Sequence, residues 1–259
     1  MKLIVALILL LMVSSVQART LIVDPRGSGD ATNLPYAISL ASSGDSIQIL
    51  PGNYSDAIVD RSLNISGIGR VILKGSLVVT APGCKVSNIT INTSGKDPAV
   101  SLRSRDNQLI RCTIAGAAIA LRALGENNTI LNNQIKSPTG FEIYSSGNKV
   151  LNSTLQCDIG IKINRTSKNQ ISGCRIIGQQ GVLIEESSQN IVTNNTFSGS
   201  GFGLVLTRSG DNELSRNNFS GTYVSGLDLS DSSRNNLSQN LITGGKIGIS
   251  LREAQNTAM

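Results

Sequence analysis

The sequence contains no histidine and no tryptophan, and only four tyrosines and four phenylalanines among its 259 residues. Without histidine, it lacks the commonest metal ligand and the usual general base near neutral pH. With so few aromatic rings, it has little surface on which sugar rings or bases can stack. We therefore expect no nucleic-acid partner and no histidine-based catalysis.

Long apolar runs are also absent beyond the N-terminus. There, Lys2 precedes an apolar run from Leu3 to Val13 and the ending Val16-Gln17-Ala18, which is the layout of a secretory signal peptide. The run is too short for a membrane span, and no later segment is apolar enough to form one. We therefore expect residues 1–18 to be removed and residues 19–259 to be secreted, displayed on the cell surface or periplasmic.

Acidic residues are outnumbered by basic ones. The formal net charge is +6, of which Lys2 supplies one unit, so the mature chain carries 6 − 1 = +5. A basic exported protein favours acidic partners such as uronic-acid polysaccharides or envelope glycans. The charges are scattered along the chain, so solubility alone is the competing explanation.

The sequence does have a repeat. From each leading Asn, an aliphatic residue follows at position +2, Asn, Cys or Ser at +5, and Ile, Leu or Phe at +7, with successive frames 20 to 23 residues apart. Such a period is typical of a solenoid, in which each repeat buries its apolar face against its neighbours. The leading residues are Asn107, Asn128, Asn148, Asn169, Asn190, Asn212 and Asn235. An earlier, degenerate frame begins at Cys84, and Asn256 opens another that stops at Met259, which predicts either a fragment or a last coil closed by another molecule.

A second short strand, usually opening with Gly, follows each frame and alternates apolar and polar residues. No segment has the long helices of a leucine-rich or ankyrin repeat. The sequence therefore predicts an all-β, single-domain parallel β-helix with coils of about 21 residues. Residues 19–70 would form the N-terminal cap and first coil, and residues 71–259 the repeat coils.

The start of this domain reads as a strand, a Gly-Ser-Gly-Asp turn, a helix over Leu34–Ala41 capped by Asn33, a strand over residues 45–50 and a Pro-Gly-x-Tyr turn. This order is similar to the opening of pectin-lyase-like proteins, including the pectin methylesterases. The resemblance implies a right-handed β-helix whose first coil is covered by the helix. Such a cover would hide unpaired backbone groups at the end of the stack.

The alignment of the frames predicts the role of each column. Positions +2 and +7, with the second-strand pairs from Phe141/Ile143 through Ile249/Leu251, should form the apolar interior. The +5 residues should form a ladder of side-chain hydrogen bonds between coils. This column is Cys112, Asn133, Ser153, Cys174, Asn195, Asn217 and Asn240.

The four cysteines do not fit a disulfide framework. Cys112 and Cys174 share a column but lie three coils apart, roughly 14 Å at β-strand spacing and beyond disulfide reach. Cys84 and Cys157 belong to other columns. We therefore expect four unpaired cysteines.

Catalytic carboxylates are scarce. The Gly-strand followed by Asn resembles the polygalacturonase branch of the superfamily, in which an Asp directly before the Gly does acid/base work. Here none of the residues in that position is acidic. Asp158 and Asp228 are the nearest matches, but three coils separate them, whereas inverting hydrolysis needs carboxyls about 6.5–9.5 Å apart.

A polysaccharide lyase remains an alternative, because it can use Lys or Arg as the base and Ca²⁺ to acidify the sugar proton. The catalytic candidates are Lys162, Arg165 and Glu185. Arg165, Glu186, Arg208 and Asp231 alternate in sign at one frame position, which also predicts a charge ladder between coils. The ligand-binding candidates on this outer face are Glu142, Lys162, Arg165, Glu186, Arg208 and Asp228.

Over most of its length the chain resembles the Asn-rich β-helix proteins of the NosD-type periplasmic family and the wider carbohydrate-binding (CASH) β-helix domains. The NosD-type label implies copper delivery. We expect no metal site and no cofactor, because soft-metal ligands do not converge in this sequence; Ca²⁺ would be needed only by a lyase.

Ten Asn-x-Ser/Thr sequons mark potential glycosylation sites. We expect turn positions such as Asn53 and Asn164 to be modifiable, and Asn88 and Asn194 to be packed inside their frames.

The sequence thus favours a non-catalytic β-helix scaffold that binds acidic polysaccharide or envelope glycans. A divergent lyase acting on uronic-acid polymers is the first alternative. A structural envelope protein that assembles end to end through its last coil is the second.

Overall fold

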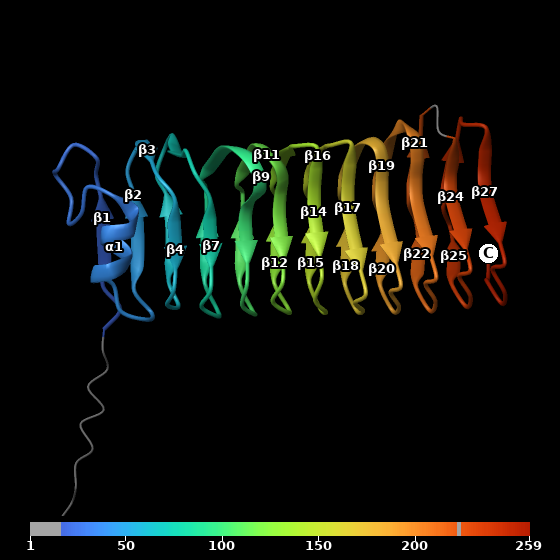
Figure 1. The fold of residues 1–259 in the computed structure, drawn as a ribbon, viewed down its shortest axis with the longest axis horizontal. Coiled ribbons are helices and arrows are strands. Elements are labelled where there is room, and N and C mark those ends of the chain that lie inside the picture. Colours follow the sequence, from blue (N-terminus) through green and yellow to red (C-terminus); the bar gives the residue numbers. More distant parts are fainter. Residues whose placement is uncertain (1–16, 222–223) are drawn as a thin grey trace, which may run out of the picture.

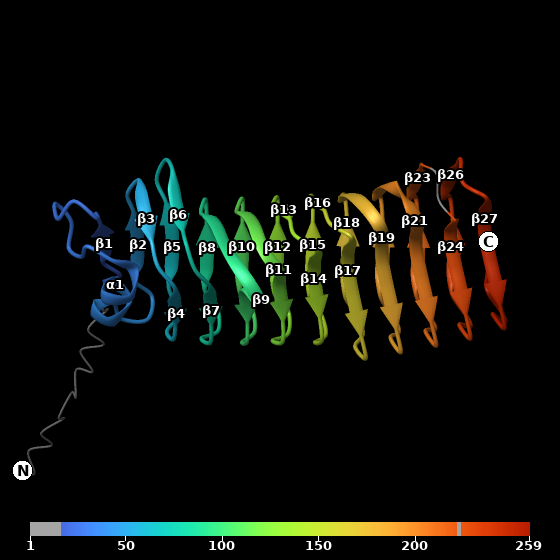
Figure 2. The ribbon, with the colours of Figure 1, turned by 45° about the horizontal axis from the view of Figure 1, so that its top comes forward.

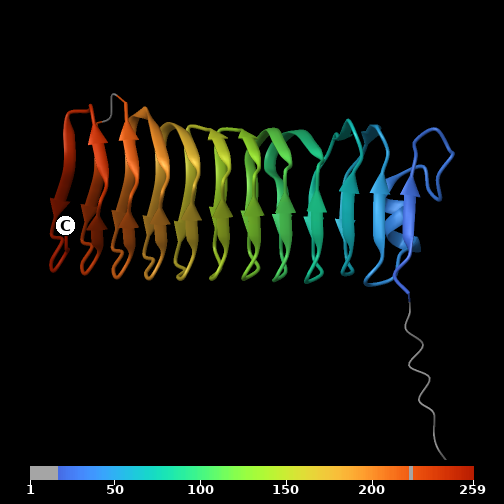
Figure 3. The same ribbon diagram turned by 180° about the vertical axis from the view of Figure 1, so that it is seen from behind.

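The structure, a computed structural model, describes residues 17–221 and 224–259. It is an elongated stack of coils, with a short helix at one end and the C-terminus at the other (Figure 1; Figure 3 shows the opposite side). The predicted signal peptide, residues 1–18, lies almost wholly outside the described residues.

One flat side of the stack is an eleven-stranded parallel sheet that takes one short strand from each coil. Its strands, in order, are β1 (Thr20–Val23), β2 (Ser46–Ile49), β5 (Asn64–Gly67), β8 (Lys85–Ser87), β10 (Gln108–Ile110), β12 (Thr129–Leu131), β15 (Lys149–Leu151), β18 (Gln170–Ser172), β20 (Ile191–Thr193), β22 (Glu213–Ser215) and β25 (Asn236–Ser238).

The remaining strands form a sixteen-stranded sheet with two columns, visible side by side in Figure 2. The first column is β3 (Gly52–Tyr54), β6 (Val71–Leu73), β9 (Thr90–Leu102), β11 (Thr113–Ala123), β13 (Gln134–Lys136), β16 (Thr154–Gln156), β19 (Arg175–Glu185), β21 (Thr196–Thr207), β23 (Asn218–Ser220) and β26 (Leu241–Thr243). The second is β4 (Ala57–Val59), β7 (Leu77–Val79), β14 (Thr139–Ile143), β17 (Ile159–Asn164), β24 (Ser225–Ser230) and β27 (Ile247–Arg252). The long strands β9, β11, β19 and β21 pair in both columns. The predicted all-β parallel β-helix is therefore confirmed.

The single helix of the described chain, α1 (Leu34–Leu40), lies beside β1, β2 and β4 at the N-terminal end. Asn33 caps it, as predicted, because its side-chain oxygen accepts a hydrogen bond from the Tyr36 amide at 2.9 Å. Leu34, Ala37 and Ile38 bury its apolar face. The helix contacts β4, the first strand of the second column, which pairs on its other side with β7.

The interior columns are as predicted over most of the stack. The +2 residues from Leu109 to Leu237 are buried, as are the +7 residues from Ile114 to Phe219. The last coil differs. Ile249 and Leu251 align with the buried Leu227 and Leu229, yet they are 39% and 40% exposed, because no further coil stacks on them among the described residues.

The last frame is also displaced from its predicted start. An isolated parallel bridge places Ala258 beside Asn236, a +1 residue, so Thr257, not Asn256, occupies the leading position. Asn256 instead adopts the left-handed backbone of the preceding corner, with φ of 52°. The reason is that the coil length varies: the last frame begins 22 residues after Asn235, not 21.

Two asparagine ladders hold the coils together. In the +5 column the Asn133 side-chain oxygen accepts from the Cys112 amide at 2.8 Å, and the Asn195 oxygen from the Cys174 amide at 2.9 Å, which confirms the predicted ladder. The leading asparagines do the same from Asn107 to Asn235. A third, hydroxyl ladder joins Thr166, Ser187, Ser209 and Ser232. The asparagines are thus structural.

All four cysteines are unpaired and buried, as predicted. Burial raises the pKa of the Cys112 and Cys174 thiols to about 11. Both residues substitute for Asn in the +5 ladder, where their backbone amides still donate to the next coil.

Two sequon asparagines that we expected to be packed lie at exposed corners of the coils. Asn88 and Asn194 are exposed, contrary to the prediction, and have φ of 57° and 56°. They lie at the left-handed corner before the +5 residue, where Asn is tolerated better than most residues. Asn53 is exposed, whereas Asn164 is half-buried and donates to Glu185.

The ladders predict a measurable loss when one side chain is removed. In Asn190→Ala, the Asn169 amide loses its acceptor at 2.9 Å in a buried site, so we expect about 1–3 kcal/mol of destabilisation. Urea unfolding measures it. The matched control is Asn218→Ala on the exposed side of β23, expected to change stability by less than about 0.5 kcal/mol; equal losses in the two variants would contradict the ladder's role.

Where another coil stacks on it, the glycine that opens a second strand is required by the stacking distance. A Cβ at Gly203 would lie 2.5 Å from the Gly226 carbonyl oxygen and 2.5 Å from Phe219 Cδ1 of the next coil. Similar contacts occur at Gly140, Gly160 and Gly181. At Gly248, in the last coil, a Cβ would meet nothing within 4 Å.

Among these strand-opening glycines, Gly248 can serve as the control for a substitution at Gly203. Gly203→Ala should destabilise the protein by about 1–3 kcal/mol through overpacking, whereas Gly248→Ala should be close to neutral. Thermal unfolding of the two variants beside the parent compares them directly. A Gly203→Ala variant as stable as Gly248→Ala would show that the coils can separate to admit a methyl group.

Candidate functional site

A polar groove lies over β11, β13, β16 and β19. Two adjoining depressions of about 540 and 600 Å³ share Lys136, Gln156 and Ile177 as lining residues. They form a continuous feature because the same side chains line both. We call it the polar groove.

Strand register arranges the floor of the polar groove as two rows. One row is Thr113, Gln134, Thr154 and Arg175. The other is Ala115, Lys136, Gln156 and Ile177. Successive members of a row come from neighbouring strands, so they are spaced by about 4.8 Å.

The groove presents amides, hydroxyls and two cations. Gln134, Lys136 and Gln156 are exposed. Lys136 and Arg175 lie in different rows with one strand between them, so their backbones are about 12 Å apart. Asp158 lines one end, beside the buried Cys157. No aromatic residue lines the groove among the described residues. Such a surface suits a hydroxyl-rich, anionic chain.

The repeat predicted these side chains to point outward, but it did not single them out. The surface is concave here because of the way the coils turn between the two columns of strands. Ser137, Pro138 and Gly178 lie at these turns and form the wall of the groove. Asp158, noted in the sequence only as a weak match to a hydrolase pattern, is brought to this wall.

The predicted site residues lie on a different face, over the second column. Glu142 and Lys162 are neighbours on β14 and β17, and Glu142 is already paired with Arg122 at 2.8 Å. Lys162 has Leu183 as its neighbour on the other side.

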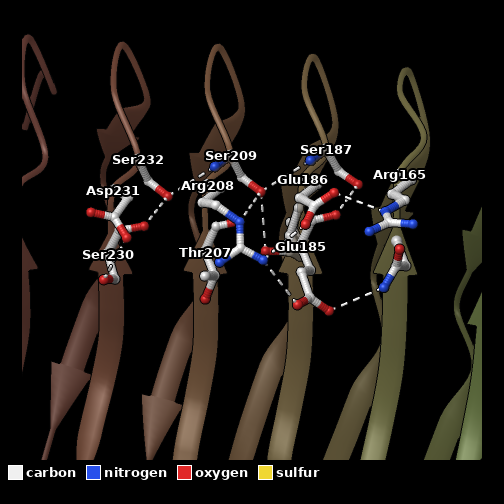
Figure 4. A network of polar contacts seen from close by, with 12 residues as sticks. Arg165, Glu185, Glu186, Ser187, Thr207, Arg208, Ser209, Ser230, Asp231 and Ser232 are labelled. Atoms are coloured by element: carbon white, nitrogen blue, oxygen red, sulfur yellow. Dashed lines mark hydrogen bonds and ion pairs between the residues drawn. The ribbon is translucent and has the colours of Figure 1, made fainter.

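The candidates Arg165, Glu185, Glu186 and Arg208 form one network at the end of the strands (Figure 4). Arg165 binds Glu186 at 2.8 Å, and Arg208 contacts Glu186 at 2.9 Å and Glu185 at 3.4 Å. The hydrogen bond from Arg165, and then that from Arg208, lowers the pKa of Glu186. The charges of these four side chains therefore neutralise one another between coils, as expected of a charge ladder.

The remaining members of the predicted set are not brought into this network. The Asp231 carboxylate accepts a side-chain hydrogen bond only from Ser230, at 3.5 Å, among the described residues. Asp228 is buried two coils beyond Leu183 and pairs with Arg252 at 3.0 Å. The roles of these side chains in ligand binding or catalysis stay predictions.

Within residues 17–221 and 224–259, no group of three or more Cys, Asp or Glu side chains is placed to hold a metal ion. The same part of the chain contains no helix of the length and apolarity that a membrane crossing requires.

Comparison with known proteins agrees with the geometry. The A-modules of the Azotobacter vinelandii mannuronan C-5 epimerases AlgE6 and AlgE4 superimpose with TM-scores of 0.55 each. Their identities are 11% and 12%, covering 86% and 87% of this chain and 92% and 94% of theirs. Pectate lyase Pel9A gives 0.48 at 14% identity, over 91% of this chain and 79% of that one. The likeness to the two epimerase modules shows the fold, a right-handed parallel β-helix.

Within this β-helix, residues 136–259 match the family described as periplasmic copper-binding protein (NosD), slightly less than half of the chain. A search of curated proteins finds no match.

The residues of this β-helix do not fit a copper site. It has no histidine, its four thiols are buried, and burial raises the pKa of Cys112, Cys157 and Cys174 to about 11. A thiol must lose its proton to bind a metal. We therefore derive no chemistry through copper.

Proposed function

We propose that this β-helix binds an acidic polysaccharide in the polar groove, without cleaving it. The observation that carries the proposal is the pair of cations, Lys136 and Arg175, set about two strands apart among amide and hydroxyl side chains. Carboxylates of an extended sugar chain would contact the cations, and its hydroxyls would contact Gln134, Thr154 and Gln156. The positive net charge favours the approach of such a polymer.

Two further points support this proposal. Solved structures with this fold include enzymes named for mannuronan, although the fold is all that the likeness shares. The groove also lacks converging carboxylates among the described residues, with Asp158 alone at its edge, which favours binding over hydrolysis. An exported location, secreted or periplasmic, would bring the protein to such polymers.

Affinity electrophoresis of residues 19–259 in gels containing polygalacturonate or alginate tests the proposal. The double variant Lys136→Ala/Arg175→Ala should bind at least about tenfold more weakly, because two charge contacts are lost, and added salt should weaken binding by the parent. The matched control is Lys149→Ala/Arg216→Ala, which removes equal charge from other strands and corners. Equal retardation of both double variants would refute groove binding.

The same samples also test the lyase alternative. Growth of near-ultraviolet absorbance from unsaturated sugars, with Ca²⁺ present, would replace the non-catalytic proposal. Its loss in Lys162→Ala would then place the chemistry on the Glu142 and Lys162 face. Binding without absorbance growth supports the proposal as stated.

End-to-end association is a separate proposal. Its support is the apolar exposure of the last coil, where Leu241 is 56% and Leu251 40% exposed. Sedimentation velocity of residues 19–259 over a range of concentrations should show growing assemblies that Leu251→Lys abolishes. A single monomeric species at all concentrations would refute it.

A further inference from the structure

A second depression lies on another face of the coils, apart from the polar groove. It has a volume of about 260 Å³ and is lined by residues of three successive coils, which include Asp97, Ser101, Arg103, Arg122 and Leu124. We call it the arginine pocket. It is small for a drug-sized ligand but large enough for a single sugar ring.

A hydroxyl that no protein group engages lines the arginine pocket. Ser101 is only 7% exposed, faces outward in register between Val78 and Arg122, and its hydroxyl forms no hydrogen bond with the described residues. Its oxygen is not among the buried side-chain atoms that lack a partner, so water reaches it in the cavity, and a ligand that enters the cavity can replace that water. The position therefore suits a ligand oxygen.

Two charged side chains at the pocket have no ion-pair partner among the described residues. Arg122 is held by Glu142, with both contacts at 2.8 Å, so its orientation is set. Arg103 forms no ion pair with any described residue and lines the same cavity, as does the unpaired Asp97. A guanidinium of this kind recognises a carboxylate, and a free carboxylate such as Asp97 accepts hydrogen bonds from hydroxyls.

An apolar rim completes the arrangement. Leu124 is 47% and Tyr144 41% exposed, and they occupy the same corner position in consecutive coils. Burial, followed by the charge of Glu142, raises the pKa of Tyr144, because the phenol lies beside the Arg122–Glu142 pair. The C–H face of a pyranose packs on such a surface.

We propose that the arginine pocket binds one uronic acid residue. Its carboxylate would pair with Arg103, supported by Arg122. Its hydroxyls would bond Ser101 and Asp97, and its ring would rest on the apolar rim. One ligand would engage the cation, the anion and the Ser101 hydroxyl together, which a bare anion would not. The site does not depend on the polar groove, because the two share no lining residue.

Titration calorimetry of residues 19–259 with sodium galacturonate, and with galactose as the uncharged analogue, tests the inference. We expect millimolar affinity for galacturonate, at least tenfold weaker binding by Arg103→Ala, and no heat with galactose. Arg216→Ala is the matched control, since its guanidinium bonds only Gln239 near the other end of the stack, and it should bind as the parent does.

Three results would overturn the inference. Galactose binding as tightly as galacturonate would show that no anion is recognised, and Arg103→Ala binding like the parent would show that the pocket is not the site. Loss of galacturonate binding in Lys136→Ala would move the sugar to the polar groove. If polysaccharide retardation fails while galacturonate binds, the proposed function falls and this site stands.

Discussion

The structure depends on one recurring hydrogen bond, from the backbone amide of a corner residue to a side-chain oxygen of the next coil. At each corner the chain leaves the ladder of strand hydrogen bonds, so its amides need other acceptors. Asn128, Asn148 and their equivalents supply them at 2.8–2.9 Å in buried positions. Each oxygen reaches the coil before it, so the ladder also sets the register between coils and keeps the corners stacked.

That constraint accounts for the closeness of the coils. With corners stacked in register, a Cβ at Gly181 would collide with the Gly203 carbonyl of the next coil, and only glycine fits. The interior is then filled by the aliphatic columns and the stacked rings of Phe197 and Phe219, 4.6 Å apart. Because buried positions are committed to packing and ladders, recognition must come from the outward rows and the corners.

The outward rows show two different uses of charge. Around Arg165, Glu186 and Arg208 the side chains neutralise one another across coils, which stabilises an exposed edge modestly. In the polar groove and the arginine pocket, cations such as Lys136 and Arg103 have no carboxylate partner among the described residues and line concave surfaces. Unpaired charge in a concavity points to a ligand more strongly than paired charge on an edge.

The sequence by itself determined the period, the interior columns, the +5 ladder and the unpaired cysteines, because each follows from positions repeated in register. It also placed the Asn33-capped helix. Only the tertiary structure decided where the surface is hollow, since this depends on how coils of 20 to 23 residues turn between columns. For the same reason Thr257 rather than Asn256 leads the last frame, and Asn88 lies at an exposed corner. Cavities arise from backbone path and side-chain reach, which a repeat pattern does not contain.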